Sequence, residues 1–277
     1  MIKLSPDLIE QVLQVAAKAG QYLNQFYQQE ITIETKSDNT PVTEADLFIS
    51  QFLIQSLSQL TPNIPILSEE SSHIPFSQRQ HWQQYWLIDP LDGTQQFIDR
   101  TDQFSVLITF VENNLPLFGV IHQPITATTY YAIRQQGAFC RRQTTTTQLA
   151  NSQTFSPLFD LTKQKQLRPI NIAVGKTLNQ TRLLQHLNPK FTYQFLTYGS
   201  SSLKALMVAT AVCDCYIRLG KTGEWDTAAA EVLLGEVGGQ IHTLHHQPLT
   251  YNQQESLINP DFIMVNNKNW NWQAILI

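Results

Sequence analysis

Two aspartates three positions apart carry the clearest chemical signal in the chain. Asp89 and Asp92 follow the apolar segment 85–88, which predicts a strand. Pro90 fixes one backbone dihedral and Gly93 permits a positive one, so we expect a sharp turn with both carboxylates on one side. Such a pair is repulsive unless a cation lies between its members, and oxygen ligands favour magnesium, calcium or manganese. The turn therefore predicts a site for a hard cation, and magnesium is the ion that we expect. The alternative is a turn whose aspartates only accept backbone hydrogen bonds.

A second apolar run ends in acids in the same way. Residues 64–67 predict a strand, and Glu69 and Glu70 follow it after Ser68. A polar segment, residues 71–84, separates this strand from the one that precedes Asp89. If the two strands are neighbours in one sheet, their terminal carboxylates converge.

Two further acids stand at expected helix starts. Asp226 opens an alanine-rich helix, and Asp46 follows Thr43 at the spacing of a capping box. Capping is an ordinary role for an aspartate at such a position. Taken alone, each of these two signals is weak.

The order of these motifs resembles that of a known enzyme family. Pro-Val-Thr-x-Ala-Asp at 41–46, Ser-Glu-Glu at 68–70, Trp-Leu-x-Asp-Pro-Leu-Asp-Gly-Thr at 86–94 and Trp-Asp-Thr-Ala-Ala at 225–229 resemble the magnesium-dependent, lithium-sensitive phosphatases of the inositol monophosphatase superfamily. The resemblance spans nearly the whole chain. Within the superfamily, the chain is most similar to the CysQ-type 3'(2'),5'-bisphosphate nucleotidases, on the segments at 36–43, 89–98, 201–204 and 216–218.

The resemblance implies a metal site and a catalytic pair. Two or three Mg²⁺ ions would be held by Glu69, Asp89, the Leu91 carbonyl, Asp92 and Asp226. The implied catalytic residues are Asp46, Thr94 and Glu69, with Thr94 bonded to the attacking water and Asp46 orienting Thr94. The amides of Gly93 and Thr94 would cradle the phosphate, since consecutive turn amides form an anion-binding concavity.

Substrate selection is expected in the second half of the chain. Serines 200–202 precede Lys204 at a helix start, where anions bind favourably, and Arg218 lies at a strand end, so a second phosphate would fit there. The alternative is serine capping with both cations solvated. The implied substrate contacts are Leu91, Asp92, Gly93, Thr94, Ser201, Ser202, Lys204, Arg218 and Asp226. The chain departs from the family's Gly-Ser-Ser-Leu-Lys, because a third serine occupies position 200 and the glycine is displaced to Gly199.

Three hypotheses for function follow. The first is hydrolysis of adenosine 3',5'-bisphosphate to AMP and phosphate, extending to 3'-phosphoadenylyl sulfate, which the resemblance links to sulfate assimilation. The second is an inositol or sugar monophosphatase that uses the same metals. The third is a regulatory protein that binds nucleotides without turnover.

The elements expected around these residues indicate an α+β / α/β chain, and the resemblance implies a layered αβαβα fold. We expect helices at 6–26, 43–60, 202–212 and 226–237, and a polar loop at 141–166. Strands are expected at 64–67, 85–88, 104–111, 117–121, 129–133, 170–174, 215–219 and 262–265. Two halves are predicted, with most metal ligands in 1–150, Asp226 and the substrate contacts in 151–277, and the site at their junction.

The amino-acid composition limits the kinds of molecule that the protein is expected to bind. A formal net charge of −4 and a pI near 6.0 argue against binding a nucleic acid polymer, so a nucleotide ligand would be a small molecule. No apolar run approaches the ~20 residues of a membrane span, and three cysteines suit a reducing compartment. We therefore expect a cytoplasmic protein, a monomer or weak homodimer, with peripheral contact at the inner membrane face left open.

Overall fold

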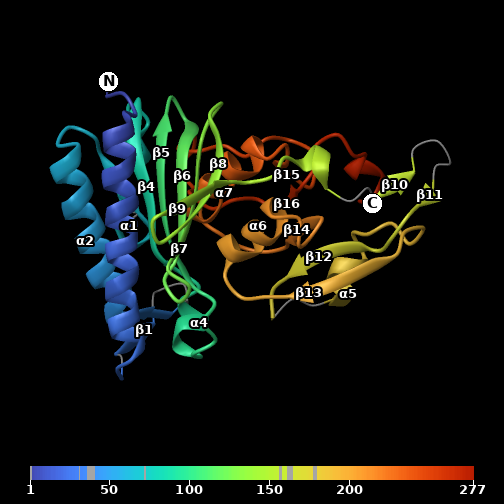
Figure 1. The fold of residues 1–277 in the computed structure, drawn as a ribbon, viewed down its shortest axis with the longest axis horizontal. Helices are drawn as coiled ribbons and strands as arrows, with labels where there is room; N and C mark the ends of the chain where they lie inside the picture. The colour runs from blue at the N-terminus through green and yellow to red at the C-terminus, as the bar shows by residue number, and fades with distance from the viewer. Residues whose placement is uncertain are drawn as a thin grey trace.

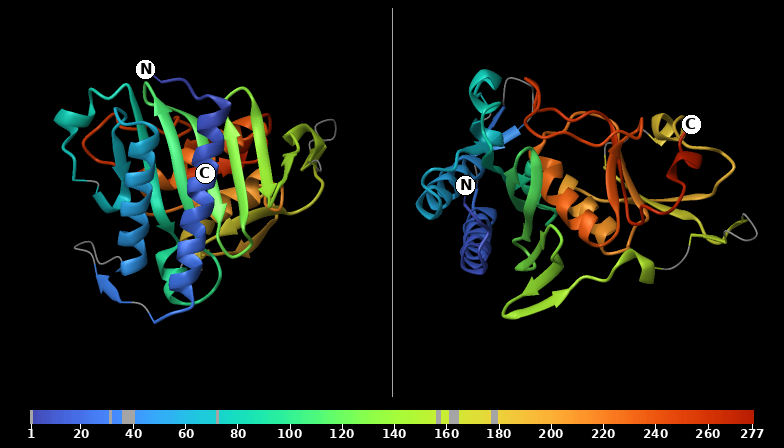
Figure 2. Two further views of the ribbon diagram at one scale, coloured as in Figure 1. Left: turned by 60° about the vertical axis from the view of Figure 1, so that its left-hand side comes forward. Right: turned by 90° about the horizontal axis from the view of Figure 1, so that it is seen from above.

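Helices and sheets alternate in layers across the molecule (Figure 1). The computed structural model describes the chain except residues 1, 31, 36–40, 72, 156–157, 161–164 and 177–179. Its helices are α1 (Pro6–Tyr27), α2 (Glu44–Leu60), α3 (Phe76–Arg79), α4 (Thr94–Ile98), α5 (Gln180–Leu184), α6 (Ser201–Ala209) and α7 (Trp225–Glu236). One layer holds α1 and α2, and α6 and α7 lie between two sheets (Figures 1 and 2). The predicted αβαβα layering is confirmed.

The first sheet has the strand order β3-β4-β5-β6-β7-β8-β9 among the described residues. These strands are β3 (Ile66–Ser68), β4 (Gln84–Asp92), β5 (Ser105–Glu112), β6 (Leu115–Gln123), β7 (Thr128–Ile133), β8 (Gly137–Arg142) and β9 (Thr145–Gln148). Only β3 and β4 run parallel within it; the remaining neighbours are antiparallel. The predicted meander after residue 104 is confirmed.

The second sheet is mixed and has the order β13-β12-β14-β16-β15. Its strands are β12 (Ile170–Val174), β13 (Tyr193–Thr197), β14 (Cys215–Arg218), β15 (Gln240–Thr243) and β16 (Phe262–Val265). The pairs β12–β13 and β12–β14 are parallel, whereas β16 is antiparallel to both of its neighbours. Two short ribbons complete the strands: β1 (Ile33–Thr35) with β2 (Pro41–Thr43), and β10 (Phe159–Asp160) with β11 (Lys165–Gln166).

Both long helices begin as their sequences predict. Ser5 Oγ accepts a hydrogen bond of 3.1 Å from Leu8 N at the start of α1. At the start of α2, Asp46 Oδ2 accepts from Thr43 N over 2.7 Å, which closes the predicted capping box. The apolar stripes of the two helices bury against the outer face of the first sheet.

Two predicted boundaries are wrong at the first sheet. The expected strand 85–88 continues to Asp92, because a register shift between Asp89 and Asp92 accommodates Pro90 without ending the strand. The expected loop 141–166 contains β9, whose four residues are all exposed. Threonine favours extended backbone, and an edge strand open to solvent carries no apolar alternation. The polar composition therefore concealed β9, and the same expected loop also contains the short ribbon of β10 and β11.

The second half also differs in detail. Strands β13 and β15 were not predicted, and the helix expected at 202–212 ends at Ala209. At its end, Thr210 Oγ1 donates a hydrogen bond to Leu206 O over 2.7 Å. Ala211 has a φ of 60°, a left-handed conformation that ends the helix.

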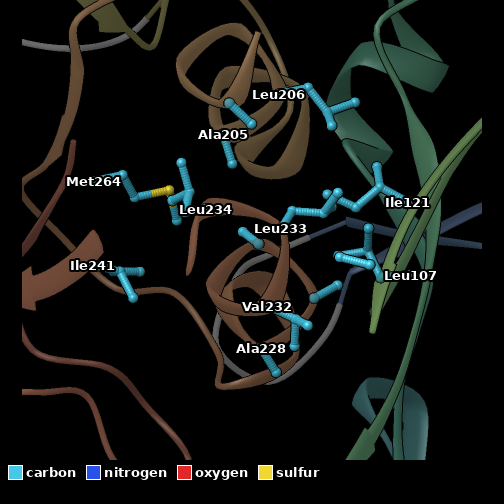
Figure 3. Close-up of a cluster of buried hydrophobic side chains, with 14 of the residues drawn as sticks. Leu107, Ile121, Ala205, Leu206, Ala228, Val232, Leu233, Leu234, Ile241 and Met264 are labelled. Atoms are coloured by element: carbon cyan, nitrogen blue, oxygen red, sulfur yellow. The ribbon is translucent and has the colours of Figure 1, made fainter. Parts of the chain in front are cut away.

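Helix α7 packs closely on the first sheet. A side chain at Gly119 of β6 would place its Cβ 2.7 Å from Ala229 Cα, so only glycine permits this approach. On the other side of α7, Leu234 faces Met264 and Ile241 of the second sheet (Figure 3). One apolar cluster thus joins both sheets through α6 and α7. The division at residue 150 into two domains stays a prediction.

Within the described part of the chain, no helix has both the length and the apolar character of a membrane span. The predicted cytoplasmic location, the contact with the inner membrane face and the monomeric or weakly dimeric state stay predictions.

Candidate active site

Parallel pairing of β3 and β4 brings the first two acids together. Ser68 pairs with Ile88, so the next residues, Glu69 and Asp89, leave the same edge of the sheet. Their side chains share a hydrogen bond. Ser50 Oγ of α2 lies 2.9 Å from Ser68 Oγ and fixes the end of β3. The predicted convergence of the two strand ends is confirmed.

Asp89, Asp92 and Asp226 form a compact cluster. Each offers a carboxylate oxygen that lies within 4.8 Å of those of the other two. Asp89 is 1% exposed and Asp92 is 6% exposed, whereas Asp226 is partly exposed. The cap of α7 is Glu224, and Asp226 Oδ2 reaches back to accept from Gly223 N over 2.6 Å. Asp226 is therefore not a plain cap, because its carboxyl group also belongs to the cluster.

The electrostatics of the cluster call for a cation. Burial, followed by repulsion from Glu69, Asp92 and Asp226, raises the pKa of Asp89 well above its usual range. Burial, followed by repulsion from Asp92 and Glu69, raises the pKa of Asp226 in the same way. A donor set made only of carboxylate oxygens fits a hard divalent cation. The geometry thus fits a metal site.

Thr94 and Asp46 form a second pair beside the cluster. Gly93 has a φ of 95°, which reverses the chain so that Thr94 begins α4. Thr94 Oγ1 donates to Asp46 Oδ1 at 3.0 Å, with Leu91 O as an alternative acceptor at 3.1 Å. Leu91 N in turn donates to Asp89 Oδ1 over 3.0 Å. Burial raises the pKa of Asp46 to about 6, although two hydrogen bonds from Thr43 oppose the rise.

The start of α6 binds a carboxylate of the cluster. Ser201 N donates to Asp92 Oδ1 over 3.1 Å, and Ser202 N donates to Asp92 Oδ2 over 2.8 Å. The hydroxyls of Ser200 and Ser202 donate to the same Oδ2. Free amides and a helix dipole favour an anion here, as the sequence predicts, but the anion that they contact is Asp92.

Two glutamines that sequence reasoning missed hold the chain just before α6. Gln103 Oε1 accepts from Gly199 N over 2.6 Å, and Gln96 Oε1 accepts from Ser200 N over 3.3 Å. A Cβ at Gly199 would lie 2.3 Å from Gln96 Cγ, so this position needs glycine. Gln96 lies in the segment 89–98 that carries the resemblance, which is the one signal that could have found it.

Lys204 and Arg218 occupy different surroundings. Lys204 is 3% exposed, and its ammonium donates to the carbonyls of Ser200 and Tyr198. Burial lowers the pKa of Lys204 to about 8. Arg218 Nη2 donates to Lys221 O over 2.9 Å, but Arg218 Nε is buried with no hydrogen-bond partner among the described residues. Arg218 therefore retains a donor for a ligand.

Comparison with known proteins identifies the family. The model of the inositol monophosphatase family matches residues 6–276. The chain belongs to the inositol monophosphatase family. It is 53% identical over 275 residues to the 3'(2'),5'-bisphosphate nucleotidase CysQ of Haemophilus influenzae, covering 99% of this chain and 98% of that protein. The CysQ of Aggregatibacter actinomycetemcomitans is 50% identical over 272 residues, or 98% and 97% of the two chains.

Solved structures of the inositol monophosphatase family share the fold. The crystal structure of CysQ from Bacteroides thetaiotaomicron has a TM-score of 0.73 and 26% identity, covering 96% of this chain and 99% of that one. The resemblance inferred from the motifs is thus confirmed.

The structure gathers most of the residues assigned by resemblance to the family. Asp89, Asp92 and Asp226 meet in the cluster with Glu69 against Asp89, and Thr94 bonds to Asp46. Residues 36–40 of the nucleotidase-like segment lie outside the described residues. The catalytic, metal and substrate roles of the individual residues stay predictions.

Proposed function

We propose that this chain is a 3'(2'),5'-bisphosphate nucleotidase that hydrolyses adenosine 3',5'-bisphosphate to AMP and phosphate. By the same reaction, 3'-phosphoadenylyl sulfate would yield adenylyl sulfate, and the activity belongs to sulfate assimilation. The observation that carries the reaction class is the cluster of Asp89, Asp92 and Asp226 beside the Thr94–Asp46 pair. The substrate class is supported by the nucleotidase relatives at 53% and 50% identity.

The carboxylate cluster is proposed to hold Mg²⁺, two or three ions, through Glu69, Asp89, Asp92, Asp226 and the Leu91 carbonyl. Bound Mg²⁺ would supply a Lewis acid for the phosphoryl group, lower the pKa of a bound water and stabilise the leaving oxygen. The raised pKa values of Asp89 and Asp226 support this assignment, because a cation relieves the repulsion that raises them.

Thr94 and Asp46 act on the attacking water. Because the Thr94 hydroxyl donates its hydrogen bond to Asp46 Oδ1, the threonine oxygen keeps lone pairs with which to accept a hydrogen bond from water. Asp46 needs to be ionised so that its Oδ1 accepts this hydrogen bond from Thr94. The bonds from Thr43 N and Thr43 Oγ1, 2.7 and 2.6 Å long, orient Asp46 from its other oxygen. The pair fixes the direction from which water attacks.

Arg218 is proposed as the main contact of the second phosphate. Its buried Nε has no hydrogen-bond partner among the described residues, and a guanidinium matches phosphate geometry. Ser201 and Ser202 already donate their amides to Asp92, and Lys204 donates to backbone carbonyls. Ser201, Ser202 and Lys204 therefore act on the substrate indirectly, through Asp92 and the start of α6. The phosphate that is removed is proposed to lie against Asp92, Gly93 and Thr94.

The substrate assignment is tested by phosphate release from three compounds with Mg²⁺: adenosine 3',5'-bisphosphate, adenosine 3'-monophosphate and inositol 1-phosphate. We expect the highest kcat/KM for the bisphosphate. Arg218→Ala should lower that value at least about 30-fold, equivalent to the loss of about 2 kcal/mol when a buried charged contact is truncated. It should change turnover of the monophosphate far less. Equal loss on both nucleotides would show that Arg218 does not bind the second phosphate.

A further inference from the structure

Ser200 has a backbone conformation that suits glycine. It is the cap of α6, with φ 59° and ψ 141°, a region that residues with a side chain seldom adopt. The family motif inferred from the sequence has glycine before Ser-Ser-Leu-Lys, and Ser200 stands at that position. A serine here carries backbone strain that a glycine would avoid, so its side chain needs a compensating contact.

Every polar atom of Ser200 has such a contact. Its N–H donates to Gln96 Oε1, and its carbonyl accepts from the buried Lys204 ammonium. Its hydroxyl oxygen accepts from Leu203 N over 3.2 Å and donates its proton to Asp92 Oδ2 over 2.5 Å. Four hydrogen bonds therefore hold Ser200, and the one that its hydroxyl donates is to a carboxylate of the acidic cluster.

The two oxygens of Asp92 are bonded unequally. Oδ2 accepts from Ser200 Oγ, Ser202 Oγ and Ser202 N, whereas Oδ1 accepts from Ser201 N alone within the described part of the chain. Three donors occupy the space around Oδ2. Oδ1 keeps a free lone pair with which to bind a cation.

We propose that Ser200 is a positioning residue for Asp92. Its hydroxyl fixes Oδ2 against the start of α6 and so presents Oδ1 to the space shared with Asp89 and Asp226. The inference rests on the proposed role of Asp92 as a metal ligand. Groups that orient a ligand from behind it typically change metal affinity 10-fold to 100-fold when removed.

Two variants separate the hydroxyl from the backbone strain. Ser200→Gly removes the hydroxyl and relieves the strain, while Ser200→Ala removes the hydroxyl and keeps the strain. Binding of Mg²⁺ alone to the full chain, without substrate, is measured by calorimetry, together with the thermal midpoint of the metal-free protein. Both variants should bind Mg²⁺ about tenfold more weakly. Only Ser200→Ala should unfold at a lower temperature.

Ser5→Gly is the matched control. Ser5 caps α1 by the same bond, 3.1 Å from Leu8 N, but has an ordinary φ of −77° and no contact with the cluster. We expect this variant to keep wild-type Mg²⁺ affinity. If Ser5→Gly weakens Mg²⁺ binding as much as Ser200→Gly does, loss of a helix cap accounts for the effect and the inference fails.

The remaining outcomes are equally decisive. Wild-type Mg²⁺ affinity in Ser200→Gly would overturn the inference. This includes the case in which Ser200→Ala alone is weakened, because the cause would then be strain that the hydroxyl no longer offsets, and not the orientation of Asp92. Asp92→Asn tests the underlying assignment. If Asp92→Asn binds Mg²⁺ as well as wild type, Asp92 is not a ligand and the proposed metal site fails; if it binds weakly while Ser200→Gly does not, only the role of Ser200 is lost.

Discussion

Thr94 Oγ1 donates a hydrogen bond of 3.0 Å to Asp46 Oδ1 and so joins the turn after β4 to the first turn of α2. Asp46 is 2% exposed, and Thr43 occupies its other oxygen. The capping box that starts the helix thus also holds the carboxylate that orients the threonine. One short motif performs a structural and a chemical task.

Asp46→Asn and Thr94→Ala should each lower kcat by about 100-fold or more, because positioned proton-transfer groups typically contribute 10²- to 10⁴-fold. Thr94→Ser keeps the hydroxyl and should stay within about tenfold of wild type. Phosphate release at saturating Mg²⁺ measures all three. Full activity in Thr94→Ala would remove the threonine from the mechanism.

The metal-free protein should lose stability as the pH rises. The pKa of Asp89 in the folded state is raised above its ordinary value of about 4. At pH values between these two pKa values, the folded state binds more protons than the unfolded state. The stability linked to Asp89 is therefore complete below pH 4 and is lost as the pH rises through the raised pKa. Thermal unfolding in chelator, from pH 4.5 to 8, should show a smaller decline for Asp89→Asn than for wild type. Parallel curves would contradict the raised pKa.

Addition of Mg²⁺ should reverse this loss near pH 7.5. A ligand at 100 times its dissociation constant stabilises the folded state by about 2.7 kcal/mol. We expect a higher unfolding temperature in wild type and little change in Asp89→Asn. An equal rise in both would place the bound ions elsewhere.

Gly119→Ala should destabilise the protein by at least about 2 kcal/mol, since overpacking commonly costs 1–3 kcal/mol and the atoms contacted here are backbone. Gly235→Ala is the control in α7, because a Cβ there meets nothing within 4 Å. It should stabilise the helix by about 0.5–1 kcal/mol. Denaturant unfolding measures both variants, and equal effects would contradict the close packing of α7 on β6.

Arg79→Ala should cost at least about 3 kcal/mol, because it leaves buried acceptors without donors. Arg79 is 1% exposed and donates to Asn252 Oδ1 over 2.7 Å and to Ile74 O over 3.2 Å. Arg182, 55% exposed and 3.7 Å from Asp261, is the matched arginine, and Arg182→Ala should cost under about 1 kcal/mol. Similar unfolding free energies for the two variants would refute the structural role of Arg79.

Local patterns predicted the parts of the site that local geometry controls. The capping box at Thr43 and the apolar strands before Glu69 and Asp89 needed only periodicity and the rule for parallel neighbours. The contacts of Asp92 were not predictable in this way. Its donors lie 108 to 110 residues away on α6, and they meet it only because α6 and α7 pack between the sheets. The structure places the Asp92 carboxylate at the start of α6, and the second phosphate expected there stays a prediction.

The most direct test of the account is phosphate release from adenosine 3',5'-bisphosphate in Mg²⁺ by the wild-type protein and by Asp89→Asn, with both folds checked by circular dichroism. We predict release of the 3'-phosphate with AMP as product in wild type, and loss of at least about 1,000-fold in kcat/KM, about 4 kcal/mol, in the folded variant. Absence of release by the wild type, or near wild-type release by Asp89→Asn, would contradict the proposed activity or its assignment to the aspartate cluster.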